Sequence, residues 1–287
     1  MRAISEPVKS YSQSLGSGLL VQPSQQLPNF GPVLGLWLDL TVGIVGGTAS
    51  NASNTIDNVI SHFAIDDQFG KAIADALGTD LTTLNDILTP RGVRQAPPVI
   101  TTDVAGAGSA EWHLFLPITV AAADMPAILK LTLNSTASLQ NANLVSAGAV
   151  TVTLIVRAAY SVGVDQPTLR IKASNPPHQQ GDNAVGPYLP QGFQVEALAF
   201  FLTGGDADFG YLTLFQGGAT FASLMPTHDF TDSDTMLMQS GHLSGEFICR
   251  FPVFVVDSTT VATINLSTDT AIRLYSIATI PQKSTGR

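Results

Sequence analysis

Histidine and cysteine are the residue types most able to do metal or nucleophilic chemistry, and this sequence has few of them. A metal centre built on β-strands draws two histidines from alternate positions of one strand, with a carboxylate as a further ligand. No His-X-His pair occurs, and the single cysteine, Cys249, lies in the apolar run FICRFPVFVV, where a buried, inert thiol is expected. We therefore expect no metal site and no cofactor among the five histidines, which are His62, His113, His178, His228 and His242.

Carboxylates offer two further candidates for chemistry. The run from His228 to Asp234 could ligate a hard cation through its oxygens, but it lacks the glycine and the terminal glutamate of a calcium loop, so a solvated loop is favoured. The pair Asp66-Asp67 could do acid–base work only if a pocket moved the two pKa values apart. The sequence indicates no pocket there, and a cap at the entry to a helix is the favoured interpretation.

Short motifs also give no catalytic constellation. Asp208-Phe209-Gly210 has the letters of a kinase motif, but the rest of the kinase set is absent, so a turn is expected. The glycine clusters at 43–47 and 106–108 are not followed by a helix carrying Lys and Ser or Thr, and they are expected to be turns as well. We expect a protein that is not an enzyme and has no catalytic, cofactor-binding or metal-binding residues.

Exposed aromatic side chains could stack on sugars, so the two tryptophans matter. Trp37 and Trp112 both lie in apolar runs typical of strands, where packing in the core is expected. Most of the 14 phenylalanines lie in similar runs. The aromatic residues therefore favour a core over a sugar site.

The composition indicates a protein that buries surface against partners. Hydrophobic residues make up 45% of the 287 positions, but charged residues make up only 12%, which is about half of the usual share. A surface poor in charge suits a subunit of an assembly; the alternative is a monomer kept soluble by its net charge of −9. The acidic balance argues against general nucleic-acid binding, because phosphate contacts require Lys and Arg. We also expect no direct sequence-specific binding of nucleic acid.

Two passages of the chain repeat in the same order. Leu27-Pro28 and Leu189-Pro190 each open a long apolar run that ends in Gly-Gly, and they stand 162 positions apart (189 − 27). EWHLFLP and EFICRFP each place a proline after a Glu-aromatic start, and Pro117 and Pro252 stand 135 positions apart (252 − 117). A third correspondence joins a strand and Pro-Gln segment at 18–26 with one at 170–180. The shared order predicts two similar domains.

The first copy carries about 27 extra residues (162 − 135), and one helical segment fits them. Within 68–88, apolar residues from Phe69 to Leu77 recur at helical spacing, Gly78 ends that helix, and a second helix follows up to Pro90. The shorter equivalent in the second copy lacks a clear helix. We expect a short helical insertion in the first domain.

The rest of the chain reads as short strands bounded by Gly, Pro, Asn or Asp. Two copies of about 130 residues with room for about eight strands each predict an all-β fold of two consecutive eight-stranded jelly rolls. Residues 17–165 form the first roll, with the helical insertion near 68–88, and residues 166–287 form the second. Residues 1–16 are polar, lack periodicity and are expected to form a flexible arm. The expected strands include 59–60, 65, 112–120, 128–133, 150–158, 195–202, 211–215, 247–256, 260–266 and 271–277.

With these features, residues 17–287 resemble a double jelly-roll major capsid protein of the PRD1/PM2-like lineage of membrane-containing bacteriophages. The passage from Ile65-Asp66-Asp67 to Gly78-Thr79-Asp80-Leu81 looks like the strand and helix of the first roll in such proteins. The resemblance is one of architecture and carries no diagnostic motif.

The resemblance implies a structural role in a virion. Such proteins form homotrimers with a pseudo-hexagonal outline, and the trimers tile an icosahedral shell together with minor capsid proteins. An internal lipid membrane usually lies beneath, and Arg2 and Lys9 of the arm could meet its headgroups. Loops at 91–110 and 203–210 are expected to face outward. Removal of residues 1–16 is expected to spare the trimer and to impair shell assembly.

Three other interpretations remain open at this stage. A jelly-roll receptor-binding, lectin-like or minor virion protein would form a small closed oligomer and would carry an exposed sugar site. A two-domain cupin-like enzyme would bind a stoichiometric metal ion, against which the missing histidine pairs count. The coat fold of tailed phages needs a long spine helix, which this sequence does not supply.

Overall fold

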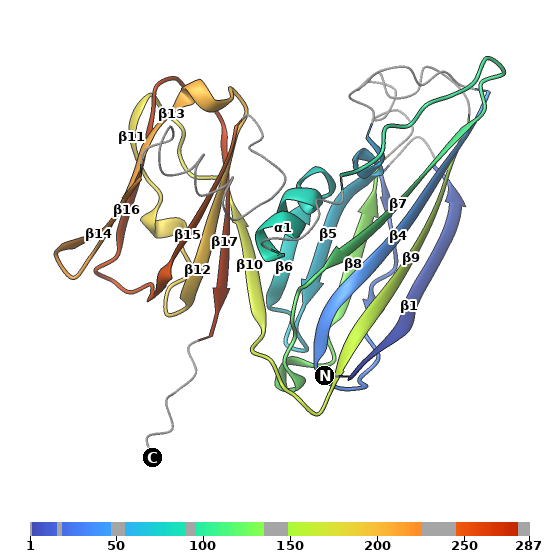
Figure 1. Ribbon diagram of the computed structural model, residues 1–287, viewed down its shortest axis with the longest axis horizontal. Helices are drawn as coiled ribbons and strands as arrows, with labels where there is room; N and C mark the ends of the chain where they lie inside the picture. Colours follow the sequence, from blue (N-terminus) through green and yellow to red (C-terminus); the bar gives the residue numbers. More distant parts are fainter. Residues whose placement is uncertain are drawn as a thin grey trace. The chain divides into compact units, whose positions relative to one another are not determined.

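The computed structural model describes residues 2–15, 19–46, 55–89, 96–134, 149–224 and 245–280 (Figure 1). The chain divides into two compact units. The first comprises Met1–Leu88 and Arg94–Thr168, and the second comprises Thr89–Val93 and Leu169–Arg287. No helix in the described part of the chain has the length and apolar composition needed to cross a bilayer.

The first sheet of the first unit contains its longest strands. β1 (Arg2–Ser14), β9 (Ala149–Val162), β4 (Val33–Val45) and β7 (Gly108–Leu116) lie in that order and pair antiparallel. The alternating sequence of β9 explains its placement, because successive side chains of a strand point to opposite faces. The inward side chains of β9 are almost fully buried, namely Val150, Val152, Leu154 and Val156.

The second sheet of the first unit is formed by shorter strands. β6 (Ala72–Leu77), β5 (Ile60–Asp66), β8 (Ile128–Leu133) and β2 (Leu20–Val21) lie in that order, and β3 (Gln25–Gln26) also pairs with β8. Both sheets contribute side chains with 2% exposure or less to the interior, including Leu38, Leu114, Phe63 and Leu131.

The helical insertion is only partly as predicted. α1 (Leu81–Leu88) confirms the second expected helix, and it is preceded by the 3₁₀ turn η2 (Gly78–Asp80). The first expected helix is wrong, because Ala72–Leu77 form strand β6 and pair with β5. The predicted helical face does not exist: Phe69 is 73% exposed and Leu77 is 37% exposed. Backbone pairing with β5 has overridden the helical spacing of the apolar residues.

The flexible arm predicted over residues 1–16 is also wrong. Arg2–Ser14 form β1, which pairs with β9 from one end to the other, with one irregularity between Pro7 and Lys9. Tyr11 and Leu15 are buried, at 6% and 8% exposure. The polar sequence misleads because an edge strand on β9 gains backbone hydrogen bonds whatever its side chains are.

The second unit repeats the two-sheet arrangement. β15 (Glu246–Val255), β12 (Gln194–Leu202), β17 (Ile272–Thr279) and β10 (Leu169–Ser174) form one sheet. β11 (Gly181–Ala184), β16 (Val261–Leu266), β13 (Phe209–Gln216) and β14 (Ala219–Leu224) form the other. Its core includes Phe200, Leu212 and Ile264, and the rings of Phe209 and Phe247 stack with centroids 4.4 Å apart.

Both units place their strands in the same order. With β2 and β3 counted as one strand, the first, eighth, third and sixth strands of each unit form one sheet, and the second, seventh, fourth and fifth form the other. Each unit is therefore an eight-stranded jelly roll, and the all-β fold class predicted from the sequence is confirmed.

Two of the three sequence correspondences fall on equivalent strands. Leu27-Pro28 and Leu189-Pro190 precede β4 and β12, the third strands, while Pro117 and Pro252 lie at or near the ends of β7 and β15, the sixth strands. The third correspondence is off by one strand, because 18–26 contains β2 and β3 whereas 170–180 contains β10. Short 3₁₀ turns complete the folds: η1 (Ile56–Val59), η3 (Ala122–Asp124), η4 (Gly186–Tyr188) and η5 (Asp206–Asp208).

Candidate functional site

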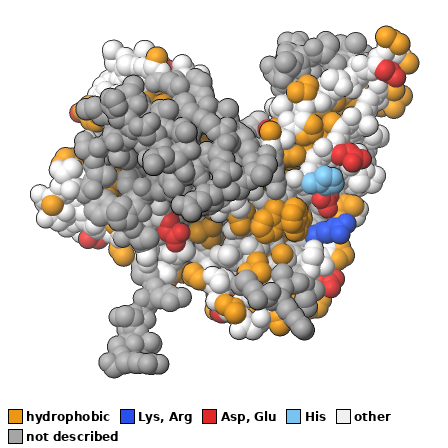
Figure 2. Space-filling model, viewed as in Figure 1, with side chains coloured by type: hydrophobic (Ala, Val, Ile, Leu, Met, Phe, Trp, Pro, Cys, Tyr) orange, Lys and Arg blue, Asp and Glu red, His pale blue; other side chains and the backbone are white. Residues whose placement is uncertain are grey.

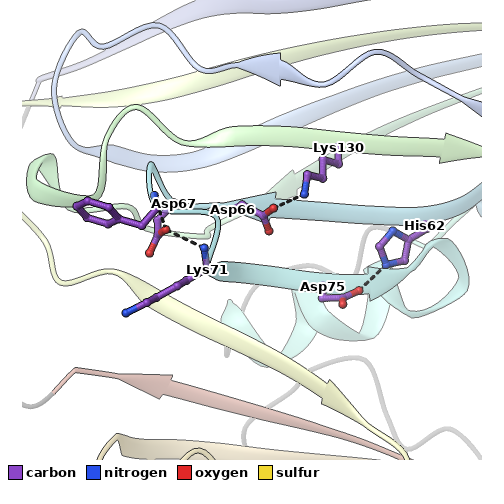
Figure 3. Close-up of polar contacts among 7 residues, drawn as sticks. His62, Asp66, Asp67, Lys71, Asp75 and Lys130 are labelled. Atoms are coloured by element: carbon purple, nitrogen blue, oxygen red, sulfur yellow. Dashed lines mark hydrogen bonds and ion pairs between the residues drawn. The ribbon is translucent and has the colours of Figure 1, made fainter.

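The histidines that the structure describes do not come together. His62 Nε2 lies 2.5 Å from Asp75 Oδ1 between β5 and β6 (Figure 3), and His113 Nδ1 lies 2.8 Å from Asp39 Oδ1 between β7 and β4. His178 is exposed, and His228 and His242 lie outside the described residues, as does the acidic run to Asp234. Within the described ranges, no group of three or more His, Cys, Asp and Glu side chains could hold a metal ion.

Asp66 and Asp67 have separate structural roles, and the expected helix cap is wrong. Asp66 forms an ion pair with Lys130 on β8 (Figure 3). Asp67 is buried, and its Oδ1 accepts backbone N–H groups from Phe69 and Lys71, both at 2.9 Å. These bonds close the hairpin between β5 and β6. Asp67 therefore caps a hairpin turn and leaves no free carboxylate pair for acid–base work.

The remaining motifs have local structural roles. The kinase-like sequence Asp208-Phe209-Gly210 spans the end of η5 (Asp206–Asp208) and the start of β13. The Asp208 carboxylate accepts a hydrogen bond from the Thr268 hydroxyl at 2.7 Å. Gly43 lies inside β4 rather than in a turn, whereas Gly106 has φ 77° and occupies one. Cys249 lies in β15, and its side chain is outside what the structure describes.

The two tryptophans differ, and the expectation that both are core residues is half wrong. Trp112 is 3% exposed and belongs to the core, but Trp37 is 37% exposed. Trp37 points outward from β4 and packs on Phe115 of β7, with ring centroids 4.7 Å apart. The apolar run around Trp37 hid this, because the alternation of inward Leu36, Leu38 and Leu40 places Trp37 on the opposite face.

Trp37 is the centre of a surface that we call the Trp37 face, the outward side of β1, β9, β4 and β7. Strand register places Trp37 beside Phe115 and Arg157, and Asp39 beside His113. Figure 2 shows hydrophobic side chains gathered over β7 and its neighbours beside a histidine and a basic side chain. The outer part of the face is mainly small and polar, with Ser10, Ser12, Ser14, Thr41, Thr151 and Thr153.

The charges on the Trp37 face are close to one another. The Asp39 carboxylate accepts from His113 through Oδ1 and lies 3.4 Å from Arg157 Nε through Oδ2. The Arg157 side chain is nevertheless 50% exposed. An arginine with this exposure keeps donors available for a carboxylate on another molecule.

A second outward surface lies on the second unit, and we call it the Asp182 face. Asp182 of β11, Asn265 of β16 and Tyr211 of β13 stand side by side in register. Asp182 Oδ1 accepts hydrogen bonds from Tyr211 Oη and Asn265 Nδ2, both at 2.7 Å. These bonds lower the pKa of Asp182, that from Asn265 most, and the bond to Asp182 raises the pKa of Tyr211. Asp182 is therefore an exposed, ionised carboxylate at neutral pH.

Apolar residues complete the Asp182 face. Val261 and Phe215 stand opposite each other on β16 and β13 and are 53% and 38% exposed. Beside them lies an open hollow of about 460 Å³. Its lining combines the apolar residues Ala184, Pro187, Val261 and Ala262 with the polar residues Gln191, Asp257, Ser258 and Thr260. Sequence reasoning missed this face, because its residues lie on three strands that are distant in the chain.

Two described polar groups of the first unit, Tyr160 and Asp57, have pKa values raised by burial. Burial, and to a lesser degree Glu6, raises the pKa of Tyr160 to about 12, so this phenol stays neutral. Burial also raises the pKa of Asp57. The Tyr160 ring packs edge-on against Phe30 with centroids 5.6 Å apart, a packing contact near the end of β9.

Comparison with known proteins identifies the fold. No protein-family model and no curated protein matches the sequence. The solved structure of the STIV MCP matches with a TM-score of 0.70 at 12% identity, covering 98% of each chain. The chain has the double jelly-roll fold. The major capsid protein P2 of bacteriophage PM2 matches with a TM-score of 0.61 at 13% identity, covering 99% of each chain.

The PBCV-1 virus capsid also matches, with a TM-score of 0.57 at 10% identity over 100% of this chain and 97% of the other. In each case the match spans both rolls rather than one. The double jelly-roll architecture predicted from the sequence is therefore confirmed.

Proposed function

We propose that this chain is the major capsid protein of an icosahedral virus and that it resides in the virion shell. The observation that carries the proposal is the match over nearly the whole length to capsid proteins, with both rolls in the same succession. The matched structures come from STIV, bacteriophage PM2 and PBCV-1, so the proposal is a shell protein of this structural lineage rather than of bacteriophages alone.

The proposed unit of assembly is a homotrimer. Each chain has two rolls with the same strand order, so three chains would contribute six similar rolls arranged approximately as a hexagon. Such trimers would tile a shell together with neighbouring trimers and minor capsid proteins. A composition with 12% charged residues supports wide contacts between copies, because few charges need to lose water when such surfaces meet.

The proposal includes an internal membrane beneath the shell, but not the tether predicted from the sequence. Arg2–Ser14 are held in a sheet, so this segment cannot serve as a free arm that reaches lipid. A membrane contact would have to be made by another part of the chain or by a minor protein.

We infer a structural role without enzymatic activity. His62 and His113 and several of the described carboxylates form pairs that tie strands together, such as His62 with Asp75 and Lys130 with Asp66. These pairs stabilise the fold and offer no nucleophile activated by a base.

Assembly in vitro tests the proposal. Purified full-length protein would be concentrated over a range of salt and pH values and imaged by negative-stain electron microscopy. Closed shells or sheets of hexagonal units are expected. A protein that gives only small, closed oligomers under all conditions would favour the receptor-binding, lectin-like or minor virion alternative.

One observation supports the lectin-like alternative as a second candidate function. Asp182 is exposed and Tyr211 and Asn265 are half-buried, and together they form an aromatic and polar group of the kind that binds sugars. A glycan array distinguishes the two functions, since a lectin would show saturable binding that Tyr211→Ala abolishes, whereas a capsid protein would show none.

A further inference from the structure

The Trp37 face and the Asp182 face are two different surfaces on one chain, and their difference matters for assembly. A closed ring of identical subunits, such as a trimer, requires each copy to use two different patches, one for each neighbour. The Trp37 face lies on the first roll and the Asp182 face on the second. One chain therefore carries both halves of a contact that could close a ring.

We propose that the Trp37 face of one copy docks on the Asp182 face of the next copy of this chain, and that three such contacts close the trimer. The inference rests on the proposed function and names the surfaces that it needs. The occupant of each face is thus a second copy of this chain rather than a peptide or a sugar.

Charge complementarity supports this pairing. Arg157 is half exposed on the Trp37 face, while Asp182 is exposed on the other. Among the described residues, the hydrogen bonds that Asp182 accepts all end on Oδ1, which leaves Oδ2 for a donor on another molecule. An Arg–carboxylate pair with excluded water is among the stronger polar contacts that proteins make.

Shape supports the pairing as well. Trp37 stands directly beside Arg157 on the neighbouring strand, about 5 Å away. Ala184 at the hollow is two positions along β11 from Asp182, which places it about 7 Å away. When Arg157 meets Asp182, Trp37 therefore lies within reach of the hollow, whose Ala184, Pro187 and Val261 side offers apolar contact to an indole ring.

The area of one contact is small, which makes closure of the ring important. Strand spacings give the Asp182 face about 23 Å by about 19 Å, or about 440 Å² on each partner of one contact. This is about half of the roughly 800 Å² that each partner buries in a standard interface, so a stable trimer requires all three contacts of the closed ring. The Trp37 face is the larger of the two, because its strands are longer.

Charge reversal tests the pairing directly. Arg157→Asp, Asp182→Arg and the double variant would be compared with wild type by sedimentation over a range of concentrations. Each single change is expected to raise the concentration at which half of the chains are trimeric by about tenfold to a hundredfold. The double variant is expected to recover at least about tenfold of that loss, because the swapped charges attract again.

Matched controls separate docking from folding. Lys71→Asp makes the same charge change on the exposed turn after β5, outside both faces, and is expected to leave the trimer unchanged. Trp37→Ser is expected to weaken the trimer about tenfold or more, whereas Phe69→Ser on the same turn is not. Thermal melting of each dilute variant shows whether the monomer remains folded.

The outcomes distinguish this inference from the proposed function. A wild-type trimer whose Arg157 and Asp182 variants behave like Lys71→Asp, or whose double variant is no better than the weaker single variant, overturns the inference and leaves the capsid proposal standing. A wild-type protein that stays monomeric at all concentrations overturns both.

Discussion

The two rolls share one strand order but build their cores from different side chains. The long strands of the first roll bury mainly aliphatic residues, such as Leu36, Leu38 and Leu40 on β4. The second roll buries Phe200, Phe209 and Phe247 on shorter strands. The order of strands is thus compatible with quite different packing, since alternation and turns define the topology while core residues need only fill the space.

The rolls also differ in how their first strands are made. β10 opens the second roll with the alternating sequence LRIKAS, whereas β1 opens the first roll with the polar sequence RAISEPVKSYSQS. β10 pairs with β17, and β1 pairs in the equivalent position with β9. Backbone pairing with a neighbouring strand can therefore form a first strand even where the sequence lacks a hydrophobic pattern. The predictions that follow test how far each roll depends on these differences.

Deletion of residues 1–14 is expected to have the largest effect. It removes β1 from β9 and exposes the backbone of a strand that is central in its sheet. We expect the first roll to lose more than about 5 kcal/mol, comparable to the whole stability of a domain. Limited proteolysis would then cut the first roll while sparing the second; a deletion variant with unchanged melting would show that β1 is dispensable, as a free arm would be.

Core truncations compare the two ways of packing. Phe200→Ala in the second roll is expected to destabilise by about 3–5 kcal/mol, and Leu38→Ala in the first by about 2–5 kcal/mol, because each leaves a cavity at a fully buried site. Denaturant unfolding measures both. Phe69→Ala, at an exposed site outside both faces, serves as the control and should cost less than about 1 kcal/mol. Equal effects of Phe200→Ala and Phe69→Ala would contradict the assigned core.

Gly78 tests the insertion between β6 and β7 of the first roll. A Cβ at this position would lie 2.0 Å from the Ile60 carbonyl oxygen and 2.7 Å from that of Asp57. Gly78→Ala is therefore expected to cost about 2–3 kcal/mol, since the backbone must move. Gly70→Ala provides the contrast. A Cβ added at Gly70 would contact no other atom, but the backbone φ of 76° is unfavourable for alanine, so this change should cost about 1 kcal/mol. Denaturant unfolding measures the free energy of unfolding of both variants. A smaller loss at Gly78 than at Gly70 would refute the close approach.

The smallest expected effect concerns Asp182 on the second roll. Hydrogen bonds from Asn265 and Tyr211 lower its folded-state pKa below the ordinary value of 3.8. Its contribution to stability is therefore present above pH 3.8 and is lost as the pH falls through the lower folded value. Tyr211→Phe should move the pKa of Asp182 upward in an NMR titration of the carboxyl carbon. An unchanged pKa would mean that the Tyr211 bond does not form.

Much of the fold could be read from the sequence because alternation is a local signal. The runs that became β9, β12 and β17 alternate or are continuously apolar between turn residues, and both Leu-Pro landmarks mark the start of a third strand. β1 and β6 could not be read in this way. The side chains of β1 are too polar, and the strand that holds it, β9, is distant in sequence. The apolar residues of β6 have helical spacing, which hides its hairpin pairing with the preceding strand β5.

The candidate surfaces were harder to predict than the fold. Trp37 lies in a run of mainly apolar residues, so the sequence does not show which of them point outward. Its outward direction follows only from the burial of Leu36 and Leu38 on either side. The Asp182 face joins β11, β13 and β16, and no spacing within the chain reveals that Asp182, Tyr211 and Asn265 stand side by side. Surfaces of this kind depend on sheet order, which sequence patterns specify only indirectly.

The central claim is that two such rolls in one chain form the trimeric unit of a virus shell. The most direct test is the mass of the purified, full-length protein in dilute solution by light scattering. We predict three times the mass of one chain, with a hexagonal outline when the same sample is imaged. A stable monomer, or a dimer, would contradict the account.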